Sequence, residues 1–497
     1  MSAAFDPVRF WARVAPERLA IRSGKQAWSY AQLDEAVDES AESLFAQGLD
    51  AGQHVAVEFE PAHGFQFAIA LHALHRIGLL PVPIGAALTP AERKGLRDRS
   101  LAELTLASAD LDPGDVAPRA GLERPAEPAR SAPATERPPL ARRLETPASL
   151  CFTSGTAGEP QAAILTHGNF LWSALASARN LGVHADDLWL CAVPLHHVAG
   201  LSILTRSAHY GTGVLLQSRF DPDEVNEAID REGVTLLSLV PPMLERLLRA
   251  RGGRLFPTRL RAALVGGGPI PTPLLEEAAE LRLRALPTYG MTETASQAAT
   301  LSPREWPEGL GSAGRPLPFV RMEIRDAKGR ALPRGEEGEI FVRGPMVAAG
   351  YFNAPDSSAA AFEGRWFRTG DIGAWDAAGR LLVLDRRSDR IVVGGENVSP
   401  AEVERALRGH PAVADACVVG VSADAWGQEV AAAIQLRPGE VATPEEILRY
   451  AAATLSAFKL PRRIAVVPAL PRSASGKLLR RVIRDRFLDR VPVEEGA

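Results

Sequence analysis

The sequence predicts an α/β fold built on parallel sheets, followed by a smaller α+β domain near its carboxyl end. The first observation is an apolar strand at residues 54–59, a helical run at 65–76 and a second strand at 79–82. Two strands joined by a helix form a β-α-β unit, which is typical of a parallel sheet. A first parallel sheet is therefore expected near the amino end.

The middle third of the chain returns to the same alternation. A strand at 235–240 is followed by Pro241-Pro242 and a helix that runs through Arg249. A strand at 262–265 then leads into Gly266-Gly267-Gly268. This pattern predicts a second parallel sheet.

After Asp385 the predicted elements become shorter. A small α+β domain of about one hundred residues fits this length. The expected elements are strands at 391–393, 414–421, 429–436 and 463–467, and helices that begin at Pro400 and Pro444.

Three segments carry the signature of a helix start, with a hydroxyl cap, proline in the first turn and glutamate reaching back. They are Thr89-Pro90-Ala91-Glu92, Ser399-Pro400-Ala401-Glu402 and Thr443-Pro444-Glu445-Glu446. Such signals fix helix ends and carry no chemistry.

Composition restricts the class of protein. The 497 residues allow about two to four domains. The 60 acidic and 56 basic residues are mixed along the chain, so no surface for nucleic acid is expected. The stretch at 110–147 is rich in Pro, Ala, Arg and Glu with few apolar positions, which predicts an exposed connection.

The cysteines and the amino end suggest a location. Cys151, Cys191 and Cys417 lie far apart among apolar neighbours, as small core residues in a reducing compartment do. Neither a signal peptide nor a membrane-spanning run is visible. We expect a cytoplasmic protein without membrane insertion, and a homo-oligomer is left open.

Residues 153–160, Thr-Ser-Gly-Thr-Ala-Gly-Glu-Pro, form a hydroxyl- and glycine-rich turn after an apolar strand. Glycines let backbone N–H groups approach an anion, so the segment suits a phosphate-binding loop. An ordinary surface turn between strands has the same composition. The segment is not a Walker loop, because Gly-Lys-Ser/Thr is missing.

The segment 288–294, Thr-Tyr-Gly-Met-Thr-Glu-Thr, places a carboxylate among hydroxyls and an aromatic ring. Glu293 suits a Mg²⁺ ligand, Tyr289 a ring stacked on a purine, and Thr292 a donor to phosphate. A capped helix start explains the same letters.

Charged residues farther along the chain suit nucleotide contacts as well. Asp371, expected on a tight turn, suits both hydroxyls of a ribose, although such an Asp is commonly structural. Residues 385–389 read as an interdomain hinge that also carries function. Lys477, in a loop of small residues, suits a mobile cation for a transferring phosphoryl group, or a plain surface lysine.

In this order, the five segments resemble those of the acyl-CoA synthetase, nonribosomal peptide adenylation and luciferase superfamily, from about Tyr30 to Lys477. The resemblance implies an acid–thiol ligase that uses ATP, Mg²⁺ and coenzyme A. It also implies a large amino-terminal domain with stacked sheets (1–387), a hinge at Ser388 and a mobile carboxyl-terminal domain (388–497). That domain would rotate between an adenylating and a thioester-forming pose.

The resemblance also implies roles for individual residues. Lys477, His196 and Glu293 would be catalytic, with Glu293 as the metal ligand. The residues that would bind ATP are Thr153, Ser154, Gly155, Thr156, Gly158, Gly267, Gly268, Tyr289, Gly290, Thr292, Asp371 and Arg386. Gly394 and Gly395 would close a tunnel for coenzyme A.

One segment departs from the superfamily pattern. Its loop usually continues Gly-Lys-Pro-Lys-Gly, whereas this chain has Glu159 and Gln161 in place of the two lysines. Fewer cations near the phosphates predict weaker ATP binding or slower turnover.

The stretch 194–206, with His196 and Arg206, is similar to 2-succinylbenzoate CoA ligases of menaquinone biosynthesis. The acid of those enzymes is a dianion, so its ring carboxylate needs a counter-charge. Arg206 is the candidate, although an arginine that snorkels from an apolar helix is the alternative. His196, Arg206, Gly268 and Ser296 would then line the acid site.

Three other functions remain open at this stage. They are a ligase for a medium-chain, malonyl or aryl acid, a non-catalytic adenylate-binding relative, and a domain that loads a carrier protein.

Overall fold

The structure is a computed structural model that divides into two compact units. The first unit contains Met1–Met322 and Phe341–Arg368, and the second contains Glu323–Ile340 and Thr369–Ala497. The described residues are 5–108, 144–153, 160–268, 270–386, 391–393, 396–398, 400–423, 427–455, 457–472 and 478–488. The predicted domain boundary at 387/388 lies outside these ranges and stays a prediction, as does most of the predicted 110–147 connection.

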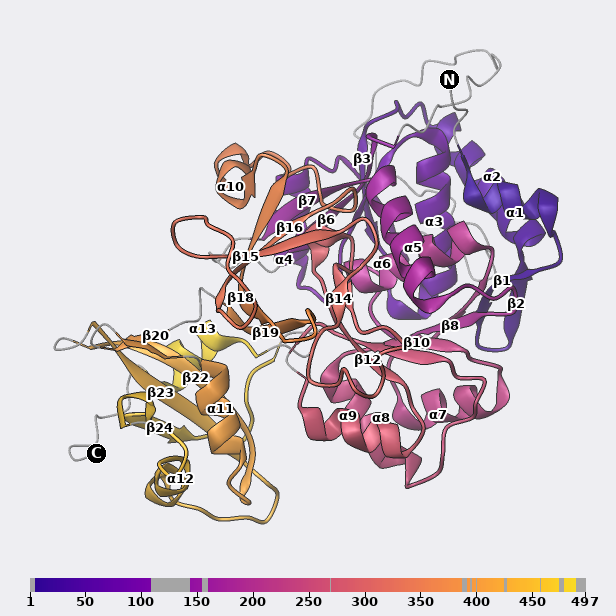
Figure 1. Ribbon diagram of the computed structural model, residues 1–497. Helices are drawn as coiled ribbons and strands as arrows, with labels where there is room; N and C mark the ends of the chain where they lie inside the picture. The colour runs from indigo at the N-terminus through magenta and orange to yellow at the C-terminus, as the bar shows by residue number, and fades with distance from the viewer. Residues whose placement is uncertain are drawn as a thin grey trace. The chain divides into compact units, whose positions relative to one another are not determined.

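A nine-stranded sheet is the centre of the first unit (Figure 1). The strands from β12 to β1 in the sheet order are parallel, while β2, β13 and β14 add antiparallel edges. In sheet order the strands are β14 (Arg315–Pro316), β13 (Ala299–Thr300), β12 (Ala285–Tyr289), β11 (Ala262–Val265), β10 (Leu236–Leu239), β8 (Leu188–Cys191), β9 (Gly213–Leu216), β1 (Leu19–Ser23) and β2 (Gln26–Ser29). The predicted strands at 235–240 and 262–265 are confirmed as parallel neighbours.

Helices cover both faces of this sheet. On one face, α7 (Pro222–Arg231), α8 (Pro241–Arg251) and α9 (Thr272–Glu280) pack into a core with the strands. On the other lie α5 (His167–Leu181), α6 (Val198–Tyr210) and α3 (Gly64–Ile77) (Figure 1). The strands are almost continuously apolar because both of their faces are buried.

A second parallel sheet stacks on the far side of α3, which contacts both sheets. It contains β4 (Leu80–Pro83), β3 (His54–Glu58) and β5 (Leu104–Ala107). The hairpin of β6 (Pro147–Thr153) and β7 (Gln161–Thr166) packs beside β4. The predicted β-α-β unit is therefore confirmed as β3–α3–β4, and the predicted stacking of mostly parallel sheets is also confirmed.

The predicted helix starts are confirmed where they are described. Thr89 caps α4 (Pro90–Ser100) and Thr443 caps α12 (Pro444–Ala451). In each cap, the threonine side chain accepts from the backbone N–H of the glutamate three positions later, and that glutamate side chain accepts from the threonine N–H. The helix α11 (Pro400–Arg408) also begins as predicted, although its cap Ser399 lies outside the described residues. The remaining helices of the first unit are α1 (Pro7–Val14), α2 (Tyr30–Ala46), α10 (Pro355–Ala361), and the short η1 (Pro61–His63) and η3 (Thr292–Thr294).

The second unit contains the predicted α+β domain. Its sheet has β21 (Glu396–Val398), β20 (Ile391–Val393), β23 (Gly427–Leu436) and β22 (Val413–Ala423), and β24 (Arg463–Val466) pairs with β23. Helices α11 and α12 pack on one face, and α13 (Arg480–Ile483) and η6 (Arg484–Leu488) on the other. The short η5 (Ala457–Lys459) precedes β24.

The boundaries between the two units fall within three strands of a further sheet. It contains β15 (Arg321–Arg325), β16 (Gly338–Arg343), β18 (Trp366–Trp375) and β17 (Phe362–Glu363), and β19 (Leu381–Arg386) pairs with β18.

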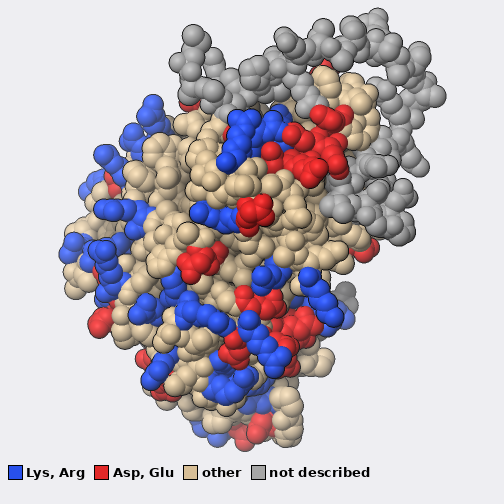
Figure 2. Space-filling view, turned by 90° about the vertical axis from the view of Figure 1, so that its right-hand side faces the viewer, with Lys and Arg blue, Asp and Glu red and all other residues tan. Residues whose placement is uncertain are grey.

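The described residues test the predictions made from the cysteines, the charge distribution and the hydropathy. Cys151, Cys191 and Cys417 are buried, as predicted for core residues. Basic and acidic side chains are interspersed on the face shown in Figure 2. Within the described ranges, no helix is long and apolar enough to cross a membrane.

Candidate active site

The candidate residues of the first unit gather at one edge of the nine-stranded sheet. His196 follows β8, Gly267 and Gly268 follow β11, and Gly290 follows Tyr289, which ends β12. These strands are parallel, so their carboxyl ends share an edge. Ligands of open α/β sheets bind at this edge.

The turn after β12 is held in an unusual backbone conformation. Ala295 and Ser296 have positive φ values of 46° and 90°, which non-glycine residues rarely adopt. A Cβ on Gly290 would lie 2.0 Å from the Ser296 carbonyl oxygen, so only glycine fits there. The Ala295 carbonyl accepts from Ser173 Oγ at 2.8 Å and from Ser202 Oγ at 3.3 Å. Helices α5 and α6 therefore fix this turn.

Glu293 lies in η3 on the same turn, and its carboxylate is held by Tyr351. The Tyr351 hydroxyl donates to Glu293 Oε1 at 2.6 Å, and the Ala348 backbone N–H donates to the Glu293 carbonyl at 2.8 Å. Burial and the neighbouring Glu293 carboxylate raise the pKa of Tyr351, which keeps the phenol protonated as a donor. The capped helix start is also correct locally, since Thr294 Oγ1 accepts from the Met291 N–H.

The hairpin that carries the predicted phosphate loop packs against this turn. Both β6 and β7 contact η3, and Thr153 pairs with Gln161 where the strands enter the loop. Gln161 Nε2 donates to Ser357 Oγ at 2.7 Å. The structure thus brings the ends of the loop beside Glu293, while Ser154, Gly155, Thr156, Gly158 and Glu159 lie outside the described residues. The effect of the missing lysines stays a prediction.

His196 is packed against the backbone of the loop after β4. A Cβ on Gly85 would lie 2.8 Å from His196 Nε2, and the His196 and His197 ring centroids are 4.3 Å apart. Burial, aided by His197, lowers the pKa of His196 to about 3. The imidazole is therefore neutral at physiological pH, which favours the predicted role of an uncharged pocket wall over that of a charged group.

Arg206 is buried in α6, with 2% of its surface exposed. Its guanidinium lies over the Trp189 ring, 5.4 Å from the centroid, and Nη2 donates to Ser173 Oγ at 3.3 Å. Nε has no hydrogen-bond partner among the described residues. The snorkelling interpretation is wrong, because the side chain does not reach solvent.

The ribose candidates lie in the second unit. Asp371 is in β18 and pairs in register with Arg386 of β19. The predicted tight turn at Asp371 is therefore wrong: Thr-Gly-Asp is a local turn signal, but pairing with β19 makes it a strand in which Gly370 has a φ of 72°. Asp371 is 5% exposed, and its N–H donates to Thr369 Oγ1 at 3.1 Å. Lys477, Ser388, Gly394 and Gly395 lie outside the described residues.

Sequence reasoning missed Tyr351, Ser173 and Trp189. Each contacts a predicted residue from a distant part of the chain, and Tyr351 is 58 positions from Glu293. No local motif surrounds them, so only the folded structure identifies them.

Two models of known protein families match this chain. The family model of the AMP-binding enzymes matches residues 8–352, and the model of the AMP-binding enzyme C-terminal domain matches residues 402–477. The chain belongs to the AMP-binding enzyme family. The resemblance seen in the ordered motifs is thereby confirmed.

Individual members of the family are similar over nearly the whole chain. A 2-succinylbenzoate–CoA ligase of Bacillus cereus is 40% identical over 471 residues, which cover 95% of this chain and 96% of the relative. The o-succinylbenzoate CoA synthetase (MenE) of Bacillus subtilis, in complex with the acyl-adenylate intermediate OSB-AMP, is 36% identical with a TM-score of 0.87. That similarity covers 98% of this chain and 99% of the other. The same Bacillus protein with ATP and magnesium ion has a TM-score of 0.85, covering 97% and 99% at 36% identity.

Proposed function

We propose that this chain joins 2-succinylbenzoate to coenzyme A through an acyl-adenylate, with release of AMP and pyrophosphate, as an acid–thiol ligase of menaquinone biosynthesis. The observation that carries the proposal is the similarity, over 98% of the chain, to a synthetase in complex with OSB-AMP. ATP, Mg²⁺ and coenzyme A are accordingly its nucleotide, metal and thiol. The proposal includes the cytoplasmic location that the sequence predicts, and the homo-oligomer stays open, as it was in the sequence.

The first step forms a bond between a succinyl carboxylate oxygen and the α-phosphorus of ATP. The bond from that phosphorus to the bridging oxygen breaks, and pyrophosphate leaves. In the second step the thiolate sulfur of coenzyme A attacks the acyl carbon, and AMP leaves with the C–O bond electrons. Lys477 would stabilise charge in the first step only.

Glu293 fits the requirements of a Mg²⁺ ligand. Mg²⁺ in phosphoryl-transfer sites is typically held by one or two carboxylates together with substrate phosphates, and it neutralises phosphate charge there. Glu293 is 8% exposed, and Tyr351 donates to only one of its carboxylate oxygens in the described contacts. Tyr351 would orient that carboxylate toward the loop between Thr153 and Gln161.

Arg206 supplies the counter-charge for the ring carboxylate. A buried guanidinium without a carboxylate partner is costly, and no acidic side chain pairs with Arg206 among the described residues. Ser173 connects Arg206 to the Ala295 carbonyl and so to Ser296. An anion that binds beside α6 would complete this arrangement.

The acid is tested by ATP-dependent AMP formation with coenzyme A and 2-succinylbenzoate, benzoate, malonate or octanoate at equal concentration. We expect clear preference for 2-succinylbenzoate. Preference for another acid would keep the ligase chemistry and reject the menaquinone role. If no acid releases pyrophosphate although ATP binds, the catalytic proposal is wrong, and the chain is an adenylate-binding relative.

A further inference from the structure

A chain of hydrogen bonds joins Arg206 to the turn that follows β12. Arg206 Nη2 lies 3.3 Å from Ser173 Oγ, and Ser173 Oγ lies 2.8 Å from the Ala295 carbonyl oxygen. A carbonyl oxygen can only accept, so the hydroxyl hydrogen of Ser173 points to Ala295 and an oxygen lone pair faces Arg206. The donation therefore runs in one direction, from the guanidinium through the hydroxyl to the backbone. Ser173 is buried, which strengthens both bonds.

The turn at the far end of this chain is itself firmly held. Ala295 has a φ of 46°, which a non-glycine residue keeps only when its surroundings fix it. The Ala295 carbonyl also accepts from Ser202 Oγ of α6 at 3.3 Å. The same turn contains Glu293, the candidate metal ligand. Through Ser173, Arg206 is thus tied to a fixed part of the candidate active site.

The remaining contacts of Arg206 leave one donor of its guanidinium without a partner. The Trp189 ring covers one face at 5.4 Å, and Trp189 Nε1 donates to Ser238 Oγ at 3.1 Å, which holds the ring. Arg206 Nε has no hydrogen-bond partner among the described residues. Nε and Nη2 lie on one edge of a guanidinium, and that edge matches the two oxygens of a carboxylate. Because Nη2 carries two hydrogens, it can bind such a carboxylate and Ser173 together.

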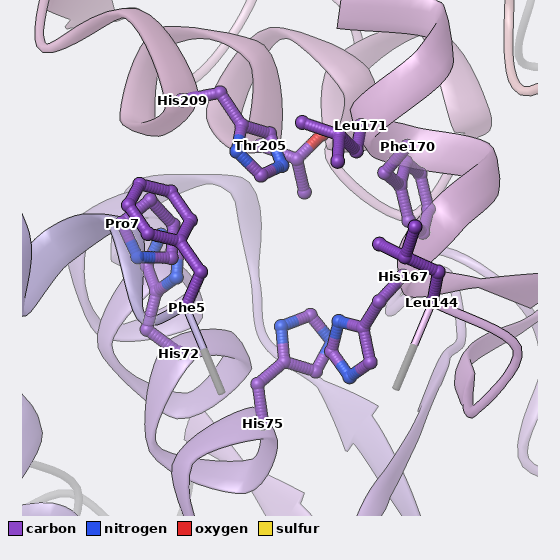
Figure 3. A pocket seen from close by; sticks show the side chains of 10 residues that line it. All are labelled: Phe5, Pro7, His72, His75, Leu144, His167, Phe170, Leu171, Thr205 and His209. Carbon is purple, nitrogen blue, oxygen red and sulfur yellow. The ribbon is translucent and has the colours of Figure 1, made fainter. Parts of the chain in front are cut away.

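The open space beside α6 supplies no anion for this donor. A cavity of about 60 Å³ lies among α3, α5 and α6 in the first unit (Figure 3). Thr205, the neighbour of Arg206 in sequence, lines it together with histidines and apolar side chains. Its lining includes neither Arg206 nor Ser173, and it contains no Asp or Glu. The contact between Arg206 and Ser173 is therefore separate from this cavity.

We propose that Ser173 is a positioning residue for acid recognition. It fixes the Arg206 guanidinium relative to the turn after β12, so that the site favours an acid with a second carboxylate. The inference rests on the proposed function, in which Arg206 binds the ring carboxylate. A mobile guanidinium would lose part of that binding energy to its own ordering, and Ser173 orders it before the acid arrives.

The test compares kcat/KM for 2-succinylbenzoate with kcat/KM for 4-oxo-4-phenylbutanoate, which lacks only the ring carboxylate. The ratio of the two values reports recognition of that carboxylate rather than general activity. Ser173→Ala should lower the ratio about tenfold or more, because Arg206 loses the acceptor that holds it. In an Arg206→Leu background, Ser173→Ala should not change the ratio further, since the two side chains act together.

Ser202→Ala is the matched control, because the Ser202 hydroxyl donates to the same Ala295 carbonyl and not to Arg206. It should change kcat/KM for both acids by the same factor. Leu171→Ala, on the cavity side of α5, loosens the packing of α5 and α6 and should also leave the ratio as in the wild type. Ser173→Cys, a weaker acceptor of similar shape, should lower the ratio if Ser173→Ala does not fold.

Two kinds of failure can be told apart. If the wild type does not prefer 2-succinylbenzoate over 4-oxo-4-phenylbutanoate, the proposed function is wrong and the inference with it. If the wild type has this preference and Ser173→Ala keeps it, the inference alone is wrong. It is also wrong if Ser202→Ala or Leu171→Ala lowers the ratio as much as Ser173→Ala does.

Discussion

Two buried arginines of the first unit have opposite surroundings. The side chain of Arg76, in α3, is 8% exposed and pairs with Asp6 at 2.9 Å, Asp34 at 2.5 Å and Asp38 at 2.9 Å. Burial lowers the pKa of Arg76, but the three aspartates outweigh it and the pKa lies above its ordinary value. A guanidinium neutralised in this way holds α1, α2 and α3 together and has no capacity for a ligand.

Arg206, in α6, is more deeply buried and has no aspartate or glutamate partner among the described residues. Burial lowers its pKa, and Tyr210 offsets only part of that effect. Its contacts are the Trp189 ring and the Ser173 hydroxyl. The difference suggests a way to separate structural from functional charges: the protein neutralises the charge of Arg76 itself, and we propose that a ligand neutralises the charge of Arg206.

Arg206→Leu gives the largest expected effect. We expect kcat/KM for 2-succinylbenzoate to fall about 100- to 5000-fold, because a carboxylate left unpaired in a buried site costs about 3–5 kcal/mol. Turnover of 4-oxo-4-phenylbutanoate, which lacks only the ring carboxylate, should change little. Steady-state kinetics with both acids measure this, and an equal loss with both would show that Arg206 does not recognise the ring carboxylate.

Arg76→Leu should instead act on stability. It leaves three aspartates without their common partner, so we expect the free energy of unfolding to fall by about 3 kcal/mol. Arg206→Leu should leave the free energy of unfolding of the ligand-free protein unchanged or raise it, because it removes an unpaired buried charge. Urea unfolding of both variants measures the contrast. Equal destabilisation would remove the distinction between the two arginines.

Tyr351→Phe extends the comparison to the carboxylate of Glu293, which accepts a hydrogen bond from the Tyr351 hydroxyl. Loss of a hydrogen bond to a charged group costs about 1.5–3 kcal/mol, which predicts about a tenfold or greater fall in adenylation rate. The Mg²⁺ concentration for half-maximal rate should rise as well, because Glu293 loses its orientation. Tyr450→Phe, at an exposed tyrosine of α12, is the control and should be neutral. An unchanged Mg²⁺ dependence would argue that Tyr351 only packs.

The sequence predicted those features that local signals determine. Continuous apolar runs located β10 and β11, and Thr89 and Thr443 marked their helices, because caps and strands are encoded by neighbouring residues. The Asp371 turn failed because strand pairing outweighed a local signal.

Contacts between distant residues had no local signal. Tyr351 reaches Glu293, and Ser173 reaches Arg206, only once the sheet and α5–α6 are assembled. The motifs therefore predicted candidate site residues, whereas the side chains that contact those residues were found only in the structure.

His196 is a third kind of buried ionisable group, because it remains neutral instead of being paired with a charge. Its folded pKa of about 3 lies below the ordinary 6.5 of an unfolded histidine. Between those values the unfolded state binds the proton and the folded state does not, so acidification below pH 6.5 favours unfolding. The loss should be about 1 kcal/mol per pH unit larger in the wild type than in His196→Gln, measured by urea unfolding at pH 6.5, 5.5 and 4.5. Identical pH slopes would mean that His196 takes up its proton in the folded state. The interpretation of His196 as a neutral pocket wall would then be wrong.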